Sequence, residues 1–226
     1  MKPSTSEFKK ISDATLNNKT IQSNLSNLYN GFHQARINMS EATPNWEEMR
    51  DKGRDIKINT IENLDHYLDM AERNVRNAGG KVVFAKDSNE ATKYVLDLAR
   101  SKGVKLVIKG KSMISEEMGL NQELIDNDIE PVETDLGEYI IQLAEETPFH
   151  IIAPAIHKTK EEVSTLFEEK LNSQKYDDVT DLTQEARRQL REKFIDADMG
   201  ITGANFLVAE TGTLVLVSNE GNGRMC

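Results

Sequence analysis

The sequence predicts an α/β fold preceded by a helical extension, and three observations support this prediction. Amphipathic, helix-length segments dominate the first 77 residues. From residue 80 onward, short β-rich runs alternate with amphipathic helices, which is typical of a mostly parallel sheet with helices on both faces. Near the end of the chain, two apolar runs are separated by three residues, as in a β-hairpin. A chain of 226 residues can bury a substantial core without disulfides.

The first 40 residues are predicted to be helical. Apolar residues recur at steps of four and three and form a narrow seam, at Ile21, Leu25, Leu28, Phe32, Ala35 and Met39. The same segment is rich in asparagine, which lowers intrinsic helicity. We interpret it as a helical arm that packs either against its own domain or over a partner or second domain.

A second long helix is predicted from about Trp46 to Asn77, after the break at Pro44. Gly79 and Gly80 are expected to end it. Its buried face is predicted to carry Ile58, Ile61, Leu64, Leu68, Ala71 and Val75.

The remainder is predicted to hold the sheet. The expected strands are Lys81–Ala85, Lys105–Lys109, Glu130–Glu133 and His150–Ala153, followed by an antiparallel pair, Phe206–Ala209 and Thr213–Val217, that ends the same sheet. Helices are expected to begin near Asn89, Glu117, Gly137, Thr159 and Asp181. We therefore divide the chain into a helical N-terminal extension, 1–78, and an α/β domain, 79–226.

Composition and charge narrow the possible functions. The formal net charge of −10 argues against nucleic-acid binding, which requires clustered basic residues. No apolar run is long enough to span a membrane, and the N-terminus does not resemble a signal peptide. The single cysteine favours a reducing compartment. Cys226 is the single cysteine, which makes a metal site within this chain unexpected. The glycine-rich run at residues 221–226 indicates a fragment of a longer protein.

The carboxyl ends of parallel strands are where ligands bind in open α/β sheets, and two predicted loops there carry charged side chains. Lys109, Lys111 and Ser112 are candidates for binding an anion beside a helix N-terminus. The alternative for this loop is a helix cap with two solvated lysines.

The second loop holds three carboxylates within six residues, Glu133, Asp135 and Glu138. Glu133 and Asp135 are candidate general acids or bases, and Glu138 is a candidate ligand contact. The carboxylates repel one another unless a cation or a lysine lies among them. The alternative is capping of the next helix by Thr134 or Asp135.

Two further loops complete the candidate site. His157 follows the strand predicted at His150–Ala153 and is expected to make a polar ligand contact, because the histidine spacing does not match a metal motif. Glu210, on a glycine turn with Thr211, Gly212 and Thr213, is a candidate catalytic residue with ligand-binding neighbours. The alternative is an ordinary turn at the sheet edge.

Several blocks, in order along the chain, resemble the LutB family of lactate-utilisation iron–sulfur proteins. The blocks are residues 79–87, 111–117, 133–143, 150–158 and 209–213. The resemblance runs from the helix at Trp46 to Cys226 and covers roughly the first half of a family member.

The resemblance implies a LUD domain, with a three-layer sandwich similar to the NagB, ribose-5-phosphate isomerase (RpiA) and CoA-transferase group. It implies a component of a cytoplasmic complex that oxidises L-lactate to pyruvate with LutA- and LutC-like partners. Family members carry [4Fe–4S] clusters in a ferredoxin-like second half, which is absent here. This chain has one cysteine where a cluster needs about four thiolates, so no cofactor is expected in it.

Glu210-Thr211-Gly212 is also similar to the glutamate and glycine turn of CoA-transferases, which suggests Glu210 acting beside Lys109 or Lys111. The isolated domain is expected to bind without turnover. The alternatives are a stand-alone enzyme of acyl or CoA transfer or sugar-phosphate isomerisation, and a non-catalytic docking domain in which the arm holds partner subunits.

Overall fold

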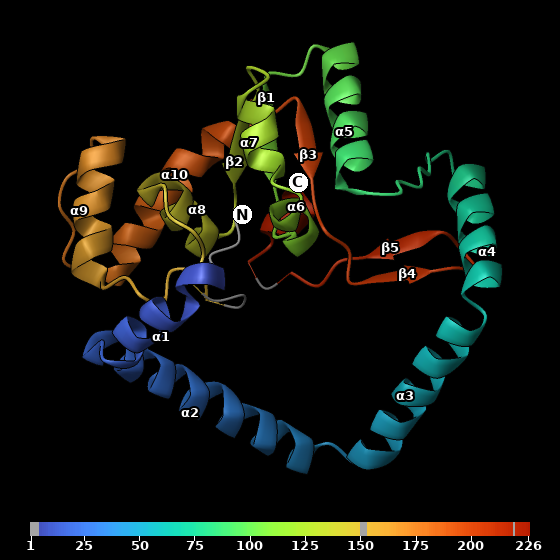
Figure 1. The fold of residues 1–226 in the computed structure, drawn as a ribbon, viewed down its shortest axis with the longest axis horizontal. Coiled ribbons are helices and arrows are strands. Elements are labelled where there is room, and N and C mark those ends of the chain that lie inside the picture. Colours follow the sequence, from blue (N-terminus) through green and yellow to red (C-terminus); the bar gives the residue numbers. More distant parts are fainter. Residues whose placement is uncertain (1–4, 150–152, 219) are drawn as a thin grey trace. The chain divides into compact units, whose positions relative to one another are not determined.

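A computed structural model describes residues 5–149, 153–218 and 220–226, and it divides the chain into two compact units (Figure 1). We call Val83–Asn205 with Leu216–Cys226 the sheet unit, and Ser4–Val82 with Phe206–Val215 the arm unit. Each is described by itself.

The sheet unit is built around three parallel strands. Central strand β1 (Leu106–Lys109) pairs with β2 (Glu130–Glu133) on one side and β3 (Met199–Ile201) on the other. The helices of this unit are α5 (Ser88–Lys102), α6 (Met113–Glu117), α7 (Leu120–Ile125), α8 (Leu136–Ala144), α9 (Lys160–Leu171), α10 (Val179–Asp196) and α11 (Asn222–Met225). This confirms the predicted α/β class with a small parallel sheet.

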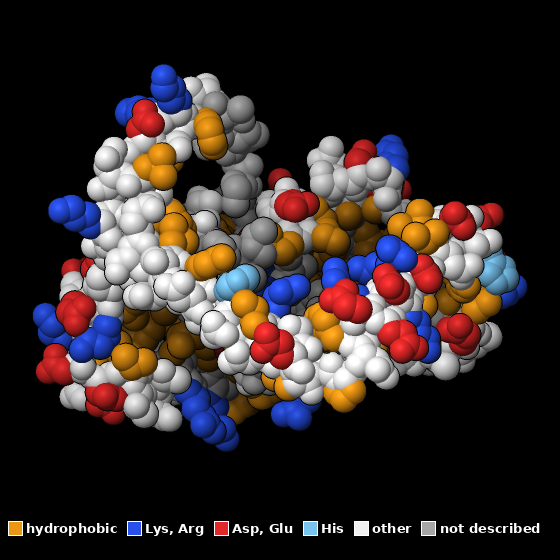
Figure 2. All heavy atoms as spheres, turned by 90° about the horizontal axis from the view of Figure 1, so that it is seen from below, with side chains coloured by type: hydrophobic (Ala, Val, Ile, Leu, Met, Phe, Trp, Pro, Cys, Tyr) orange, Lys and Arg blue, Asp and Glu red, His pale blue; other side chains and the backbone are white. Residues whose placement is uncertain are grey.

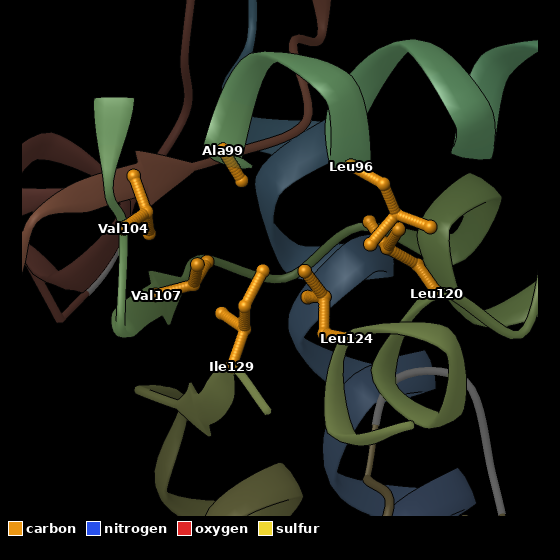
Figure 3. Packing of buried hydrophobic residues seen from close by; sticks show 7 residues of the cluster. All are labelled: Leu96, Ala99, Val104, Val107, Leu120, Leu124 and Ile129. Atoms are coloured by element: carbon orange, nitrogen blue, oxygen red, sulfur yellow. The ribbon is translucent and has the colours of Figure 1, made fainter. Parts of the chain in front are cut away.

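Helices cover both faces of this sheet because side chains alternate along each strand. On one face, Val107 packs with residues of α5 and α7, as the close view in Figure 3 shows. On the other face, Val132 packs with residues of α8, α9 and α10, among them the fully buried Phe167. The two clusters hold the strands, and their carboxyl ends, in a rigid frame.

Local sequence signals set the helix boundaries in this unit. Asp87, Ser112, Asp135 and Thr159 each accept a hydrogen bond from a backbone N–H in the first turn of the helix that follows. At Thr159 a capping box with Glu162 is complete. Of the two caps considered for the helix after Glu133, Thr134 and Asp135, the structure has Asp135.

The prediction of the strands was partly wrong. Residues 81–85 form no strand, although their β-branched composition favours one. The prediction at His150–Ala153 falls mostly outside the described residues. Strand β3 was missed, because a three-residue run containing Gly200 carries almost no periodic signal.

The arm unit consists of helices and one hairpin. Its elements are the short 3₁₀ turn Thr5–Glu7, α1 (Phe8–Leu16), α2 (Lys19–Ala42), α3 (Trp46–Glu62), α4 (Leu64–Asn77), β4 (Phe206–Val208) and β5 (Thr213–Val215). Each predicted long helix is broken at asparagine, the first between Asn17 and Asn18 and the second at Asn63. The antiparallel pair was predicted correctly, but it forms a sheet of its own and does not extend the parallel one.

The predicted buried face of the second helix was wrong over most of its length. Ile58, Ile61, Leu64 and Leu68 are 40–71% exposed, and only Ala71 of that stripe is fully buried. In the first helix, Phe32 and Met39 are likewise exposed. Figure 2 shows such apolar side chains among charged ones on one face. Periodicity identifies which residues share a face, but it does not provide a partner to cover them.

Candidate functional site

The carboxyl ends of β1 and β2 place a lysine and a glutamate side by side. Lys109 and Glu133 are the last residues of these strands and are partners in the parallel register. Their side chains form an ion pair with an Nζ–Oε1 distance of 2.6 Å and are 1% and 6% exposed. A buried charge requires such a partner, because its desolvation is otherwise uncompensated.

Asn121 of α7 completes this pair into a triangle. Lys109 Nζ donates to Asn121 Oδ1 at 2.7 Å, and Asn121 Nδ2 donates to Glu133 Oε1 at 2.7 Å. Lys109 and Glu133 therefore each have partners inside the protein. Their proposed roles, in anion binding and in acid–base chemistry, stay predictions.

The loops after β1 and β2 are joined by a second ion pair. Lys111 Nζ lies 3.4 Å from Asp135 Oδ2, and both side chains are partly exposed. Asp135 also caps α8 by accepting from the N–H of Glu138 at 3.2 Å, and Ser112 caps α6 by accepting from the N–H of Ser115. Both helices are thus capped from these loops, but the alternative of two solvated lysines was wrong, because Lys109 is buried against Glu133 and Lys111 pairs with Asp135.

Glu138, unlike Glu133 and Asp135, forms no ion pair among the described residues. It is 4% exposed, and its Oε2 atom is buried without a hydrogen-bond partner among the described residues. Burial, and then the charges of Glu133, Glu116 and Asp135, raise the pKa of Glu138 from 4.5 to about 8. At neutral pH this carboxyl group is therefore mostly protonated.

A cleft of about 730 Å³, which we call the strand-end cleft, follows β3. It is lined by Thr202, Leu216, Ser218, Glu220, Gly221, Gly223, Arg224 and Cys226. The backbone approaches closely here: a Cβ atom on Gly110 would lie 2.9 Å from Thr202 Oγ1 and 3.1 Å from Gly223 Cα. Glycine at residue 110 therefore allows the loop after β1 to touch the segment after β3 and helix α11.

Of the described residues that line the strand-end cleft, Arg224 alone is basic. Within the described part of the chain, no carboxylate lies at ion-pair distance from its guanidinium group, so its charge is available to a ligand. Thr202 and Ser218 add hydroxyl groups. The thiol of Cys226 is less reactive, since burial raises its pKa.

Glu210 lies in the arm unit, on the turn of the β4–β5 hairpin, and is exposed. Asn74 of α4 secures this turn: its Nδ2 donates to the carbonyl oxygens of Ala209 at 2.9 Å and Glu210 at 3.0 Å. Thr211 Oγ1 donates to Thr213 Oγ1 at 2.8 Å, which uses both hydroxyls within the turn. The role of Glu210 beside Lys109 or Lys111 stays a prediction.

His157 is held in place from one side of its ring. Its Nε2 lies 2.7 Å from Glu146 Oε2, and Lys158 contacts the other oxygen of the same carboxylate. These contacts lower the pKa of Glu146, that of Lys158 most strongly. The Nδ1 atom of His157 is buried and has no hydrogen-bond partner among the described residues. The expected ligand contact of His157 stays a prediction.

Sequence reasoning missed Asn74, Asn121 and Arg224. An asparagine inside a helix gives no local sign of a partner far along the chain, and Arg224 lies in the glycine-rich run 221–226, to which no site was assigned. A clue was present in the glycines around Arg224, since glycine-rich loops permit close backbone approach to a ligand.

The described residues show neither a metal site nor a membrane-spanning helix. The described residues contain no group of three or more histidine, cysteine, aspartate or glutamate side chains arranged to hold a metal ion. Cys226 is the only thiol in the chain, so these residues do not fit an iron–sulfur cluster. Among the described helices, none combines the length and apolarity needed to cross a bilayer.

Comparison with known proteins identifies relatives of most of this chain. The protein named Lactate utilization protein B of Bacillus cereus (strain AH820) is 48% identical over 187 residues, which cover 83% of this chain and 40% of the relative. The protein of the same name from Bacillus thuringiensis (strain Al Hakam) matches equally well. The chain thus spans about 40% of the length of these curated relatives, and no solved structure matches it.

The family described as LUD domain matches residues 68–226, a range that includes the whole sheet unit described here, α4 from Leu68 and the β4–β5 hairpin. The resemblance predicted from the sequence blocks is therefore confirmed, and the chain belongs to the LUD domain family.

Proposed function

We propose that this chain is the LUD-domain part of a lactate-utilisation protein that takes part in oxidising L-lactate to pyruvate. The observation that supports this most directly is the 48% identity to proteins named Lactate utilization protein B. Because the chain spans 40% of their length, the electron-transferring [4Fe–4S] clusters are assigned to the remainder of the full protein. The proposed setting is the cytoplasm, with LutA- and LutC-like partners.

The contribution of this domain in the proposal is to bind a small carboxylate. L-Lactate and pyruvate each present a carboxylate beside a hydroxyl or carbonyl oxygen. The guanidinium of Arg224 matches a carboxylate with paired N–H donors, and Thr202 and Ser218 offer hydroxyls to the second functional group. The position of the cleft, at the carboxyl ends of parallel strands, supports this assignment.

The finer fold and domain assignments belong to the same proposal. Helices on both faces of a parallel sheet are compatible with the three-layer sandwich of the NagB, RpiA and CoA-transferase group. The helical extension is proposed to comprise residues 1–78 and the LUD domain residues 79–226.

Calorimetric titration of the chain with L-lactate and with pyruvate tests the binding step. We expect Arg224→Met to weaken carboxylate binding by about tenfold or more, because a charge-assisted hydrogen bond is lost. Arg191→Met, at an exposed position of α10, is the matched control and should leave binding unchanged. Equal affinities of the parent and Arg224→Met would refute the assignment of this cleft.

Growth tests the role of the whole protein. Deletion of its gene should abolish growth on L-lactate and spare growth on glucose, and the full-length gene should restore growth. Glu210→Gln in the full-length protein should fail to restore growth while the protein stays folded. Restoration by this variant would remove Glu210 from the proposed chemistry, and unimpaired growth of the deletion strain would refute the lactate role.

A further inference from the structure

A second cleft in the sheet unit has a different chemical character. It has a volume of about 530 Å³ and lies among α6, α7, the end of β2, α8 and the segment that follows α8. We call it the acidic cleft, because its lining includes five glutamates: Glu116, Glu133, Glu138, Glu145 and Glu146. Among the described residues that line it, none is a lysine, an arginine or a histidine.

Three of these glutamates are neutralised by cations of the protein. Lys109 pairs with Glu133, Lys170 with Glu145 at 2.7 Å, and Lys158 with Glu146. Among the described residues, Glu116 and Glu138 form no ion pair. The cleft therefore keeps two uncompensated acidic groups.

Glu138 is the group that points to a ligand. Its carboxyl is almost fully buried with Oε2 unpartnered, a state that native structures rarely leave unsatisfied. The charged groups that face it are Glu133 of β2, Glu116 of α6 and, in the loops, Asp135 and Lys111. Lys109 offsets Glu133 and Lys111 offsets Asp135, so the unpaired Glu116 leaves a net negative charge that favours a cation over a carboxylate.

The remaining wall favours an organic cation over a bare ion. Leu120, Ile125 and Ile141 supply apolar surface beside the glutamates. The amide groups of Asn121 and Gln142 are already engaged, to Lys109 and Glu133 and to the β2 backbone. An ammonium head on a short alkyl chain needs one carboxylate and an apolar wall, and both are present.

We propose that the acidic cleft binds an alkylammonium group, with Glu138 as the ion-pair partner of the ammonium and Leu120, Ile125 and Ile141 around the alkyl chain. The site is separate from the strand-end cleft, which shares no lining residue with it. The proposal does not depend on the lactate assignment.

Binding to this site requires ionised Glu138. The pKa of free Glu138 is about 8, so a proton must leave when the cation binds below that pH. With Glu138 about one-tenth ionised near pH 7 and about nine-tenths ionised near pH 9, affinity should rise about tenfold between these pH values. Burial sets this pKa most strongly, followed by the charges of Glu133, Glu116, Asp135 and Lys111.

The test compares two probes of matched shape and opposite charge, n-butylammonium and butyrate, each added to the full 226-residue chain. Methyl NMR signals of Leu120, Ile125 and Ile141 report occupancy, and they remain observable at alkaline pH. Glu138→Gln removes the charge and keeps the shape. The matched control is Glu123→Gln, an exposed position of α7 that does not line the cleft.

In the parent chain, n-butylammonium should move these signals saturably, with about tenfold tighter binding near pH 9 than near pH 7, and butyrate should not. Glu138→Gln should weaken binding at least about tenfold and abolish its pH dependence, while Glu123→Gln behaves as the parent. The proposal is overturned by an absence of shifts at millimolar probe, by equal response to butyrate, or by unchanged binding to Glu138→Gln.

Discussion

The buried, hydrogen-bonded side chains of Lys109, Glu133 and Asn121 allow a quantitative prediction about the stability of the sheet unit. Replacing Lys109 with methionine keeps the length and apolar stem of the side chain and removes the charge. Glu133 is then left 5% exposed, with Asn121 as its remaining side-chain partner and Glu138 acting on it across the acidic cleft. We expect Lys109→Met to be strongly destabilising.

The magnitude follows from the geometry. At the 2.6 Å separation of Nζ and Oε1, the attraction is about 6 kcal/mol at an effective dielectric constant of about 20, before desolvation is subtracted. Breaking a buried pair by removing one partner costs about 3–5 kcal/mol, because the other charge stays buried. In the double variant Lys109→Met with Glu133→Gln, the neutral amide still accepts from Asn121, so all but about 1–2 kcal/mol should be recovered.

The assay is urea unfolding monitored by the methyl NMR signals of Val107 and Val132, which lie in the sheet unit. Fluorescence of Trp46 is unsuitable, because Trp46 begins α3 in the arm unit. A loss below about 1 kcal/mol for Lys109→Met, or a double variant no more stable than the single one, would refute the reasoning.

Three further predictions concern the hairpin and the acidic cleft. Gly212→Ala should lower the free energy of unfolding by more than about 2 kcal/mol, because Gly212 has a φ of +69° and its Cβ would lie 2.5 Å from the backbone nitrogen of Val75. Gly79→Ala, also at positive φ but with open space around its Cβ, should lower it by about 1 kcal/mol. Thermal unfolding that ranks the two variants as equally stable would contradict this. Asn74→Ala should destabilise the hairpin by about 1–2 kcal/mol, because two hydrogen bonds to backbone carbonyls are lost. Amide hydrogen exchange in β4 and β5 should become faster, and unchanged exchange would contradict this. Because the pKa of Glu138 is raised on folding from 4.5 to about 8, its stabilising contribution is complete below about pH 4.5 and is lost as pH rises from there through about 8. Glu138→Gln should therefore be more stable than the parent by up to about 5 kcal/mol near pH 9 and not near pH 4.5, and equal urea midpoints near pH 9 would contradict it.

Local signals predicted the elements whose causes are local. Asp87, Asp135 and Thr159 cap helices because a short polar side chain needs only the next turn to find its partner. Strand Glu130–Glu133 was predicted residue for residue, and the turn at Gly212 was placed correctly. Residues 81–85 show the limit, since their β-branched composition has no neighbouring strand with which to pair.

The position of the candidate site in the fold was predicted from the sequence, but the pairing of its side chains was not. The rule that ligands bind at the carboxyl ends of parallel strands led to Lys109, Lys111, Glu133, Asp135 and Glu138, and the structure gathers these residues around the ends of β1 and β2. Which lysine pairs with which carboxylate was not predictable, because ion pairing depends on strand register and helix packing. The question whether a lysine lies among the carboxylates has a separate answer for each residue. Glu133 and Asp135 form ion pairs with lysines, and Glu138 forms none with the described residues.

By itself, the sequence determined the alternation of strands and helices, the single thiol, the acidic charge and the family, because all of these are properties of residues near one another or of the chain as a whole. Only the tertiary structure decided that Asn121 joins Lys109 to Glu133 and that Asn74 secures the turn of Glu210. It also decided that Glu138 Oε2 is buried with no hydrogen-bond partner among the described residues. These outcomes depend on contacts between segments far apart in the chain, and the energies of such contacts arise from burial and geometry that no local pattern records.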